Sequence, residues 1–156
     1  MRLLTGLFIG LATLQNGAPG VAQKPNLASL IPAAEVIVVA KVTEADYSRT
    51  ASDGPMIARA KVLRSLKGRL RQDQTFGFTE TAWAGPNYKA SEVRVLFLES
   101  GGANSWRIVS NLFAKVDFFI EPEATPQLTV NLLKSILEKL PALETRRVLL
   151  TKDMLQ

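Results

Sequence analysis

The strongest constraint on the fold is an apolar run near the start of the chain, residues 35–43, in which β-branched side chains stand at both odd and even positions. Successive side chains of a strand point to opposite faces, so such a run fits a strand whose two faces are both covered. A strand of this kind lies at the centre of a sheet. The run therefore predicts a β-rich core organised around residues 35–43.

Five further runs predict strands. Residues 56–66 alternate small apolar side chains with cations, as in a strand that is buried on one face only. Lys67-Gly68 ends this run, and glycine at that position predicts a backbone with positive φ or a bulge. The other predicted strands are residues 74–79, 92–99, 106–109 and 116–120.

Helices are predicted on either side of these strands. Asn26 can cap a short helix that Pro32 ends. After the last strand, Thr125 can cap a longer helix with Pro126 at its first position, and Pro141 ends it. The apolar residues of this second helix recur at helical spacing: Leu133, Ile136, Leu137 and Leu140.

The first part of the chain is typical of a signal peptide. Arg2 precedes an uncharged, mostly apolar stretch, residues 3–14, and Gly20-Val21-Ala22 offers a cleavage site with small residues. We expect removal of residues 1–22 and a protein that is periplasmic or secreted. A permanent membrane anchor is the alternative, which is disfavoured because the apolar stretch is shorter than the ~20 residues that span a bilayer.

The rest of the chain is interpreted as one domain, residues 23–141, followed by a tail, residues 142–156. The tail is predicted either as a weak helix or as a frayed end on the surface. With 47% hydrophobic and 21% charged residues, the chain is too apolar to be disordered. One folded domain is expected for this length.

The composition also excludes several kinds of active site. The chain contains no Cys and no His. It therefore lacks the side chains for the usual zinc or haem site, for a Cys nucleophile and for a His-based triad. Without Cys there are no disulfides, so the domain must be stabilised by packing. We expect no metal and no cofactor.

The predicted elements indicate an α+β, mainly β fold: a small barrel of five to six strands with a short N-terminal helix and a C-terminal helix. The segments AEVIVVAKV (residues 34–42), VLRSLKG (62–68) and VLFL (95–98) carry a resemblance. In this order they resemble bacterial exported domains related to the netrin-like module and the tissue inhibitors of metalloproteases. The resemblance covers residues 26–140.

This resemblance implies a five-stranded barrel of the oligomer-binding (OB) type. Ala90-Ser91 stands before the fourth predicted strand, where the pattern of these domains has a glycine. The inhibitors of this group chelate the zinc of their target through an N-terminal Cys, which this chain lacks. Inhibition in that manner is therefore not implied, and a different protein-binding surface on the same barrel stays open.

A cluster of cations on the second predicted strand and the turn after it is one candidate binding surface. It could be a solvated strand face or a surface for an anionic partner. Nucleic acid is disfavoured because OB-type barrels bind it through aromatic residues interleaved with cations, and residues 59–71 contain no aromatic residue. The cluster, here called the basic stripe, comprises Arg59, Lys61, Arg64, Lys67, Arg69 and Arg71.

A second candidate is the loop of residues 83–89. Trp83, Tyr88 and Lys89 flank a Gly-Pro-Asn turn, and exposed aromatic residues on a loop are typical of protein or glycan contacts. The alternative is that Trp83 folds back and plugs one end of the barrel, since large aromatic residues are usually well buried.

Carboxylates are the remaining candidates for acid–base chemistry. Two of them could serve a glycosidase, or several could bind a hard cation, but the sequence brings no two together. A solvated surface role is the simpler interpretation for each of them: Glu80, Glu92, Glu99, Asp117, Glu121 and Glu123.

Together these observations predict a non-catalytic exported module that contacts another macromolecule. The expected partner is a protein or an anionic component of the cell envelope, in keeping with the net charge of +5. We expect neither nucleic acid nor a stable membrane anchor. Two alternatives stay open: a carboxylate-dependent hydrolase, marked by two close carboxylates in a cleft, and a small-ligand-binding barrel, marked by a large apolar pocket.

Overall fold

The computed structural model describes residues 26–46, 56–80, 88–102, 105–109, 116–140 and 147–156. Two short α-helices lie in these ranges, α1 (Leu30–Ala33) and α2 (Val130–Lys139), together with 3-10 helices at Leu27–Ser29, Pro122–Gln127 and Lys152–Leu155. The strands are β1 (Val36–Ala45), β2 (Met56–Lys67), β3 (Thr75–Glu80), β4 (Val93–Ser100), β5 (Trp106–Ile108), β6 (Asp117–Ile120) and β7 (Arg147–Leu150).

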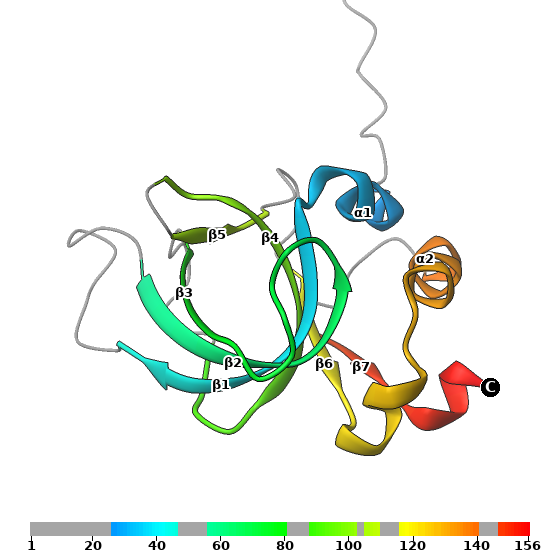
Figure 1. Ribbon diagram of the computed structural model, residues 1–156. Coiled ribbons are helices and arrows are strands. Elements are labelled where there is room, and N and C mark those ends of the chain that lie inside the picture. Colours follow the sequence, from blue (N-terminus) through cyan, green and yellow to red (C-terminus); the bar gives the residue numbers. More distant parts are fainter. Residues whose placement is uncertain (1–25, 47–55, 81–87, 103–104, 110–115, 141–146) are drawn as a thin grey trace, which may run out of the picture.

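Five of the strands form a closed barrel (Figure 1). They follow the order β1, β2, β3, β5, β4, and β4 pairs again with β1. All neighbours are antiparallel except β3 and β5, which are parallel. The predicted α+β, mainly β barrel is therefore confirmed, and its architecture is compatible with an OB-type barrel. Strand β6 pairs with β4 outside the barrel, so the barrel itself has five strands rather than six.

Strand β1 has apolar residues on both parities because it separates two cores. One parity points into the barrel, where these side chains pack with residues of the other barrel strands. The opposite parity points to the helices. The interior positions of β1 are Val36, Val38, Ala40 and Val42, and its outer positions are Ile37 and Val39, all of them buried.

Strand β2 contributes to both cores because its register shifts along β1. Val39 pairs with Arg64 while Ala40 pairs with Val62, so Leu63 is an extra residue, a β-bulge. Before the bulge the apolar side chains of β2 enter the barrel, as the alternating pattern predicts. After it, the partly buried Leu63 and Leu66 pack against the outer core instead.

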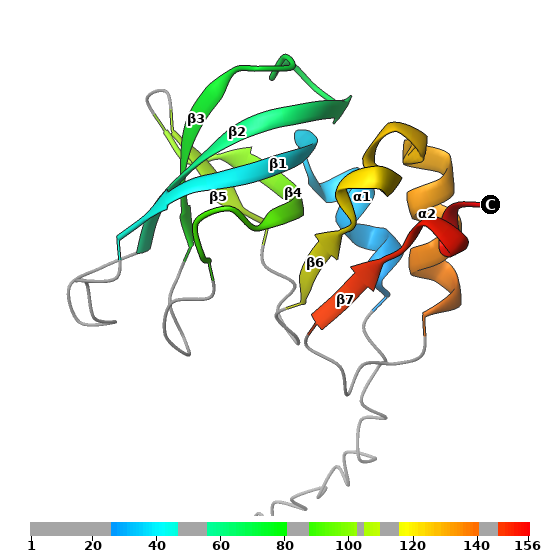
Figure 2. The same cartoon turned by 90° about the horizontal axis from the view of Figure 1, so that it is seen from below.

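A second layer covers one side of the barrel and consists of α1, α2, β6 and β7 (Figure 2). Helix α2 is capped by Thr129, whose Oγ1 accepts a hydrogen bond from Leu132 N at 3.2 Å. The predicted start at Thr125 and Pro126 is wrong, since residues Pro122–Gln127 form a separate 3-10 helix. Leu128 and Thr129 have extended backbone between the two helices, and Leu128 is buried in the outer core, so α2 begins only after Thr129.

The C-terminal residues form a strand rather than the weak helix or frayed end predicted from the sequence. Strand β7 pairs in parallel with all four residues of β6. Val148, Leu150 and Leu155 are buried in the outer core, whose packing provides the stabilisation that the local pattern does not reveal. Residues 142–146 lie outside the described ranges.

Four described residues outside the strands adopt left-handed backbone: Gly68, Asp73, Ser91 and Gly102. Gly68 has a φ of 89°, as predicted, and a Cβ there would lie 2.5 Å from the carbonyl oxygen of Glu35. Ser91, shortly before β4, has a φ of 73°. A non-glycine residue is disfavoured in this region, so Ser91 carries local strain.

Candidate binding site at the open end of the barrel

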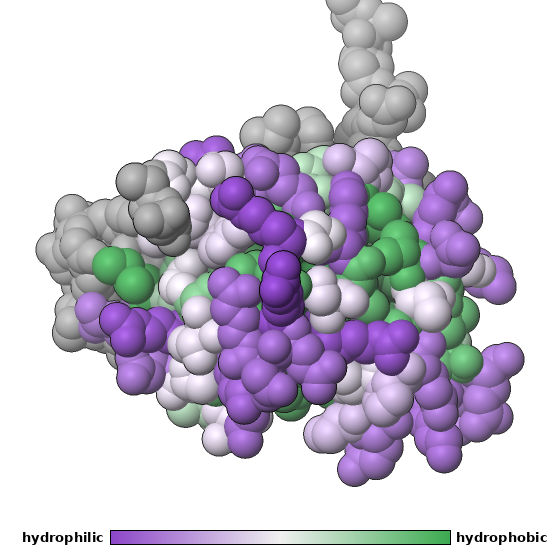
Figure 3. Space-filling model, in the orientation of Figure 1, coloured by the Kyte–Doolittle hydropathy of each residue, from purple (hydrophilic) through white to green (hydrophobic). Residues whose placement is uncertain are grey.

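The turn between β2 and β3 lies at one end of the barrel and is held rigidly. Gly68 and Asp73 supply its left-handed positions, and Asp73 N donates to the carbonyl of Val62 at 2.9 Å. Leu70 is buried in the barrel interior and anchors the turn. Arg69 and Arg71, on either side of Leu70, are therefore exposed. Figure 3 shows hydrophilic side chains gathered over this turn.

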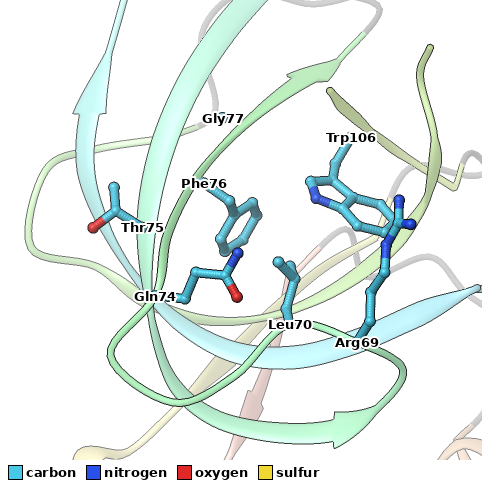
Figure 4. A pocket seen from close by; sticks show the side chains of 7 residues that line it. All are labelled: Arg69, Leu70, Gln74, Thr75, Phe76, Gly77 and Trp106. Carbon is cyan, nitrogen blue, oxygen red and sulfur yellow. The ribbon is translucent and has the colours of Figure 1, made fainter. Parts of the chain in front are cut away.

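A cavity of about 410 Å³ opens beside the turn (Figure 4). Its apolar surface comes from side chains that also belong to the barrel interior, and its polar surface comes from the turn and the start of β3. In the part of the chain that the structure describes, no acidic residue lines it. The lining residues are Arg69, Leu70, Gln74, Thr75, Phe76, Gly77 and Trp106. This part of the barrel is called the open end.

Arg69 lies across the aromatic wall of this cavity. Its Cζ is 4.9 Å from the ring centroid of Trp106, a cation–π contact. Trp106 itself is largely buried, with 6% of its surface exposed. Among the described residues Arg69 has no ion pair or hydrogen bond, so its N–H donors are available at the cavity. Arg71, also exposed, stands nearby on the same turn.

The remaining members of the basic stripe are engaged within the protein. Arg59 and Lys61 lie on the outer face of β2 and form exposed ion pairs with Glu44 (3.8 Å) and Asp73 (2.8 Å). Exposed pairs of this kind contribute little to stability. They do, however, reduce the free positive charge along this strand.

Arg64 and Lys67 bind backbone carbonyls on the helical side. The guanidinium of Arg64 donates to the carbonyl of Pro126. Lys67 Nζ donates to the carbonyl oxygens of Ile31 (2.9 Å) and Ala34 (2.6 Å), at the end of α1. Because the last carbonyls of a helix lack partners within the helix, Lys67 acts as a C-terminal cap. The stripe is therefore not one continuous surface, and Arg69 and Arg71 form its part at the open end.

The second predicted surface is only partly described. Trp83 lies outside the described residues. Tyr88 is 3% exposed and packs edge-on against Phe78, with ring centroids 5.1 Å apart, so its prediction as an exposed contact residue is wrong. The loop sequence does not reveal this burial, because the Tyr88 ring packs in the barrel interior against residues from other strands. Lys89 is exposed, and its backbone N–H donates to Glu92 Oε2.

At the opposite end of the barrel Arg94 forms a buried cluster that the sequence did not reveal. Arg94 is 2% exposed, and its guanidinium donates to Glu92 Oε2 and to Asp117 Oδ1, the latter at 3.1 Å. Its Cζ lies 4.4 Å from the ring centroid of Tyr88 and 4.3 Å from that of Phe119. We call this part of the barrel the sealed end, defined by these five residues.

Burial raises the pKa of the Tyr88 hydroxyl well above its usual value, and the negative charge of the neighbouring Glu80 raises it further. Tyr88 also hydrogen-bonds with the Glu80 side chain. Glu80 is itself 6% exposed. The phenol is therefore neutral throughout the physiological range and serves the packing of the sealed end.

The other carboxylates singled out from the sequence do not line the cavity. Glu99 pairs with Arg107 at 2.9 Å, and Glu121 Oε2 accepts a hydrogen bond from the backbone N–H of Lys152 at 2.9 Å. Glu123 is exposed. Among the described residues no three acidic side chains are arranged to hold a metal ion.

Sequence reasoning identified Arg69 and Arg71 but missed their neighbours. The sequence pattern places Trp106 only in a predicted strand and Gln74 only at the start of another. They share a cavity with Arg69 because β3 and β5 pair in parallel, with Phe78 opposite Trp106. No local pattern encodes that pairing.

Comparison with known protein families and with curated proteins finds no match for this sequence. Within the described ranges, none of the helices has the length and apolar character needed to cross a membrane.

Proposed function

We propose that this chain is a non-catalytic exported binding module that contacts another macromolecule through the open end of the barrel. The observation that carries the proposal is the position of Arg69 and Arg71 beside an open cavity that none of the described acidic residues lines. Exposed arginines next to aromatic side chains are characteristic of binding surfaces. The partner is a protein or an anionic component of the cell envelope.

The resemblance to netrin-like exported domains supports this proposal, because those barrels bind other proteins through their surface. The closed five-stranded barrel is compatible with that relationship. Export after removal of residues 1–22 belongs to the same proposal and gives the module access to the envelope.

The pairing of the carboxylates favours binding over hydrolysis. A glycosidase needs two carboxyl groups on either side of a substrate cleft. Glu92 and Asp117 instead bind the buried Arg94, and neither lines the cavity. Neutralised in this way, they are poor candidates for an acid and a base.

Affinity capture with a matched pair of variants tests the proposal. The full chain is immobilised through a C-terminal tag and exposed to envelope extract from a bacterium that exports it. The variant Arg69→Gln/Arg71→Gln removes two charges at the open end. The control, Arg59→Gln/Lys61→Gln, removes two charges from the outer face of β2.

We expect a retained envelope component whose amount falls at least about tenfold in the open-end variant, as the loss of charge-assisted hydrogen bonds implies. Retention should be unchanged in the control. Equal retention by both variants and the original chain contradicts the proposal.

A second candidate is a small-ligand-binding barrel, and the cavity is the observation that favours it. Its volume of about 410 Å³ falls within the range typical of ligand sites. The same apolar and cationic lining would then hold a free molecule.

A further inference from the structure

We infer that the open-end cavity binds a carboxylate carried on an apolar group about the size of one ring. This inference deepens the proposed function and rests on it for the biological setting. Of the residues that line this cavity, only Arg69 was predicted from the sequence as a binding residue, and three of the lining side chains carry hydrogen-bond donors without an acceptor among the described residues.

The first donor is the guanidinium of Arg69. Its contact with the Trp106 ring fixes its position, while its N–H groups have no acceptor among the described residues. The five N–H donors of a guanidinium form a planar fork that matches the two oxygens of a carboxylate. Arg69 therefore offers a bidentate site at one wall of the cavity.

The second donor is the amide of Gln74. Its Oε1 accepts a hydrogen bond from Arg71 N at 3.1 Å, which assigns the orientation of the amide. The Nε2 group is thereby turned to the side of Phe76, into the cavity, as Figure 4 shows. It makes no hydrogen bond with any described residue.

The third donor is the indole N–H of Trp106. In Figure 4 the indole nitrogen lies on the side of the ring that faces Phe76 across the cavity. No described residue accepts a hydrogen bond from it. An indole nitrogen is a donor only. These three donors have no acceptor among the described residues, so they favour a ligand that supplies oxygen acceptors.

Charge and volume narrow the ligand class. Among the described residues that line the cavity Arg69 is the one cation, which matches a monoanion such as a carboxylate. Leu70, Phe76 and Trp106 provide an apolar floor. A dry cavity of roughly 150 Å³ already holds a benzene ring. The space of about 410 Å³ therefore accommodates one ring together with its carboxylate.

The same chemistry has two sources, a free aryl acid or the C-terminal carboxylate of a polypeptide whose last residue is apolar. The test uses both. Phenylacetate and a short peptide ending in Phe are titrated into the ¹⁵N-labelled full chain, each beside its neutral amide. The readout is the indole N–H signal of Trp106, distinguished from that of Trp83 by the variant Trp83→Phe.

We expect both carboxylates to shift the Trp106 signal saturably and their amides to bind at least about tenfold more weakly. Arg69→Gln should weaken carboxylate binding by a similar factor, while Arg59→Gln, on the outer face of β2, should leave it unchanged. Tighter binding of the peptide than of phenylacetate identifies a chain end as the source. Equal affinities identify a free acid.

The inference is overturned if neither carboxylate shifts the signal at concentrations up to about 10 mM, a range that covers weak fragment binding. It is also overturned if the amides bind as well as the acids. Its failure is distinct from that of the proposed function. Envelope capture that depends on Arg69 and Arg71 without carboxylate binding refutes only the inference, whereas carboxylate binding with unaltered capture refutes only the function.

Discussion

The two ends of the barrel each place an arginine over an aromatic ring, but with opposite surroundings. At the sealed end Arg94 is 2% exposed and bound by two carboxylates and two rings. At the open end Arg69 is exposed, contacts one ring and has no acidic partner among the described residues. Strand β4 joins the two ends, since Arg94 lies near its start and Ser100, at its end, pairs with Trp106.

The difference shows that pairing, rather than residue type, separates a structural arginine from one available for binding. A buried guanidinium must be neutralised and hydrogen-bonded because desolvation of an unpaired charge is costly. An exposed one keeps its hydration and can exchange water for a ligand. Arg94 satisfies the first condition and Arg69 the second.

The two ends are separated by the closed barrel, and Val38→Asp should unfold that barrel. Val38 is completely buried in the interior, where a carboxylate has no partner. We expect loss of cooperative unfolding in circular dichroism. Lys41→Asp, on the exposed side of the same strand, should retain a normal thermal transition. A normal transition for Val38→Asp as well would show that the strand assignment is wrong.

Lys67→Met should cost about 2 kcal/mol in the free energy of unfolding, because two charge-assisted hydrogen bonds to the end of α1 are lost. Arg71→Met is the matched control at the open end and should change stability by less than about 0.5 kcal/mol. Urea denaturation of both variants measures the difference. Equal losses of stability in the two variants would mean that Lys67 does not stabilise the end of α1 and is an exposed cation like Arg71.

Tyr88→Phe tests the burial of Tyr88 at the sealed end through the pH dependence of stability. The folded-state pKa of Tyr88 lies above its unfolded value, so the neutral phenol is favoured in the folded protein. The stability from this shift is fully present below the unfolded pKa and is lost as pH rises above it. Urea denaturation at neutral and strongly alkaline pH should show a smaller alkaline loss for Tyr88→Phe. An identical pH dependence contradicts the burial of this residue.

Ser91→Gly should stabilise the chain slightly, by about 0.5–1 kcal/mol, since glycine adopts the left-handed backbone without steric cost. The gain is limited because glycine also makes the unfolded chain more flexible. A differential scanning measurement that shows destabilisation would mean that the Ser91 side chain has a structural role.

Much of the fold followed from two-residue periodicity, and the exceptions have physical reasons. Residues 35–43 predicted a strand covered on both faces because both parities are apolar, and the structure places a core on each face. The four residues of β7 were missed because a run that short has no distinctive period, and its stability comes from pairing with β6. Thr125 followed by Pro126 predicted a helix start, but α2 is capped by Thr129, after an extended Leu128 that breaks the helical backbone.

The site was predictable only in part. Arg69 and Arg71 stood out as charges, but their separation from Arg64 and Lys67 depends on the bulge in β2 and on the helices that cover one side of the barrel. Arg94 falls between the apolar Val93 and Val95, and strand alternation alone indicates only that it points to the face opposite theirs. Its burial arises from partners on other strands.

The most direct test of the account compares Arg94→Met with Arg69→Met by urea denaturation. Arg94→Met leaves Glu92 and Asp117 without their shared cation and should lower the free energy of unfolding by about 3 kcal/mol. Arg69→Met removes one exposed cation–π contact and should cost less than about 1 kcal/mol. Losses of equal size in the two variants would contradict the distinction between a sealed and an open end.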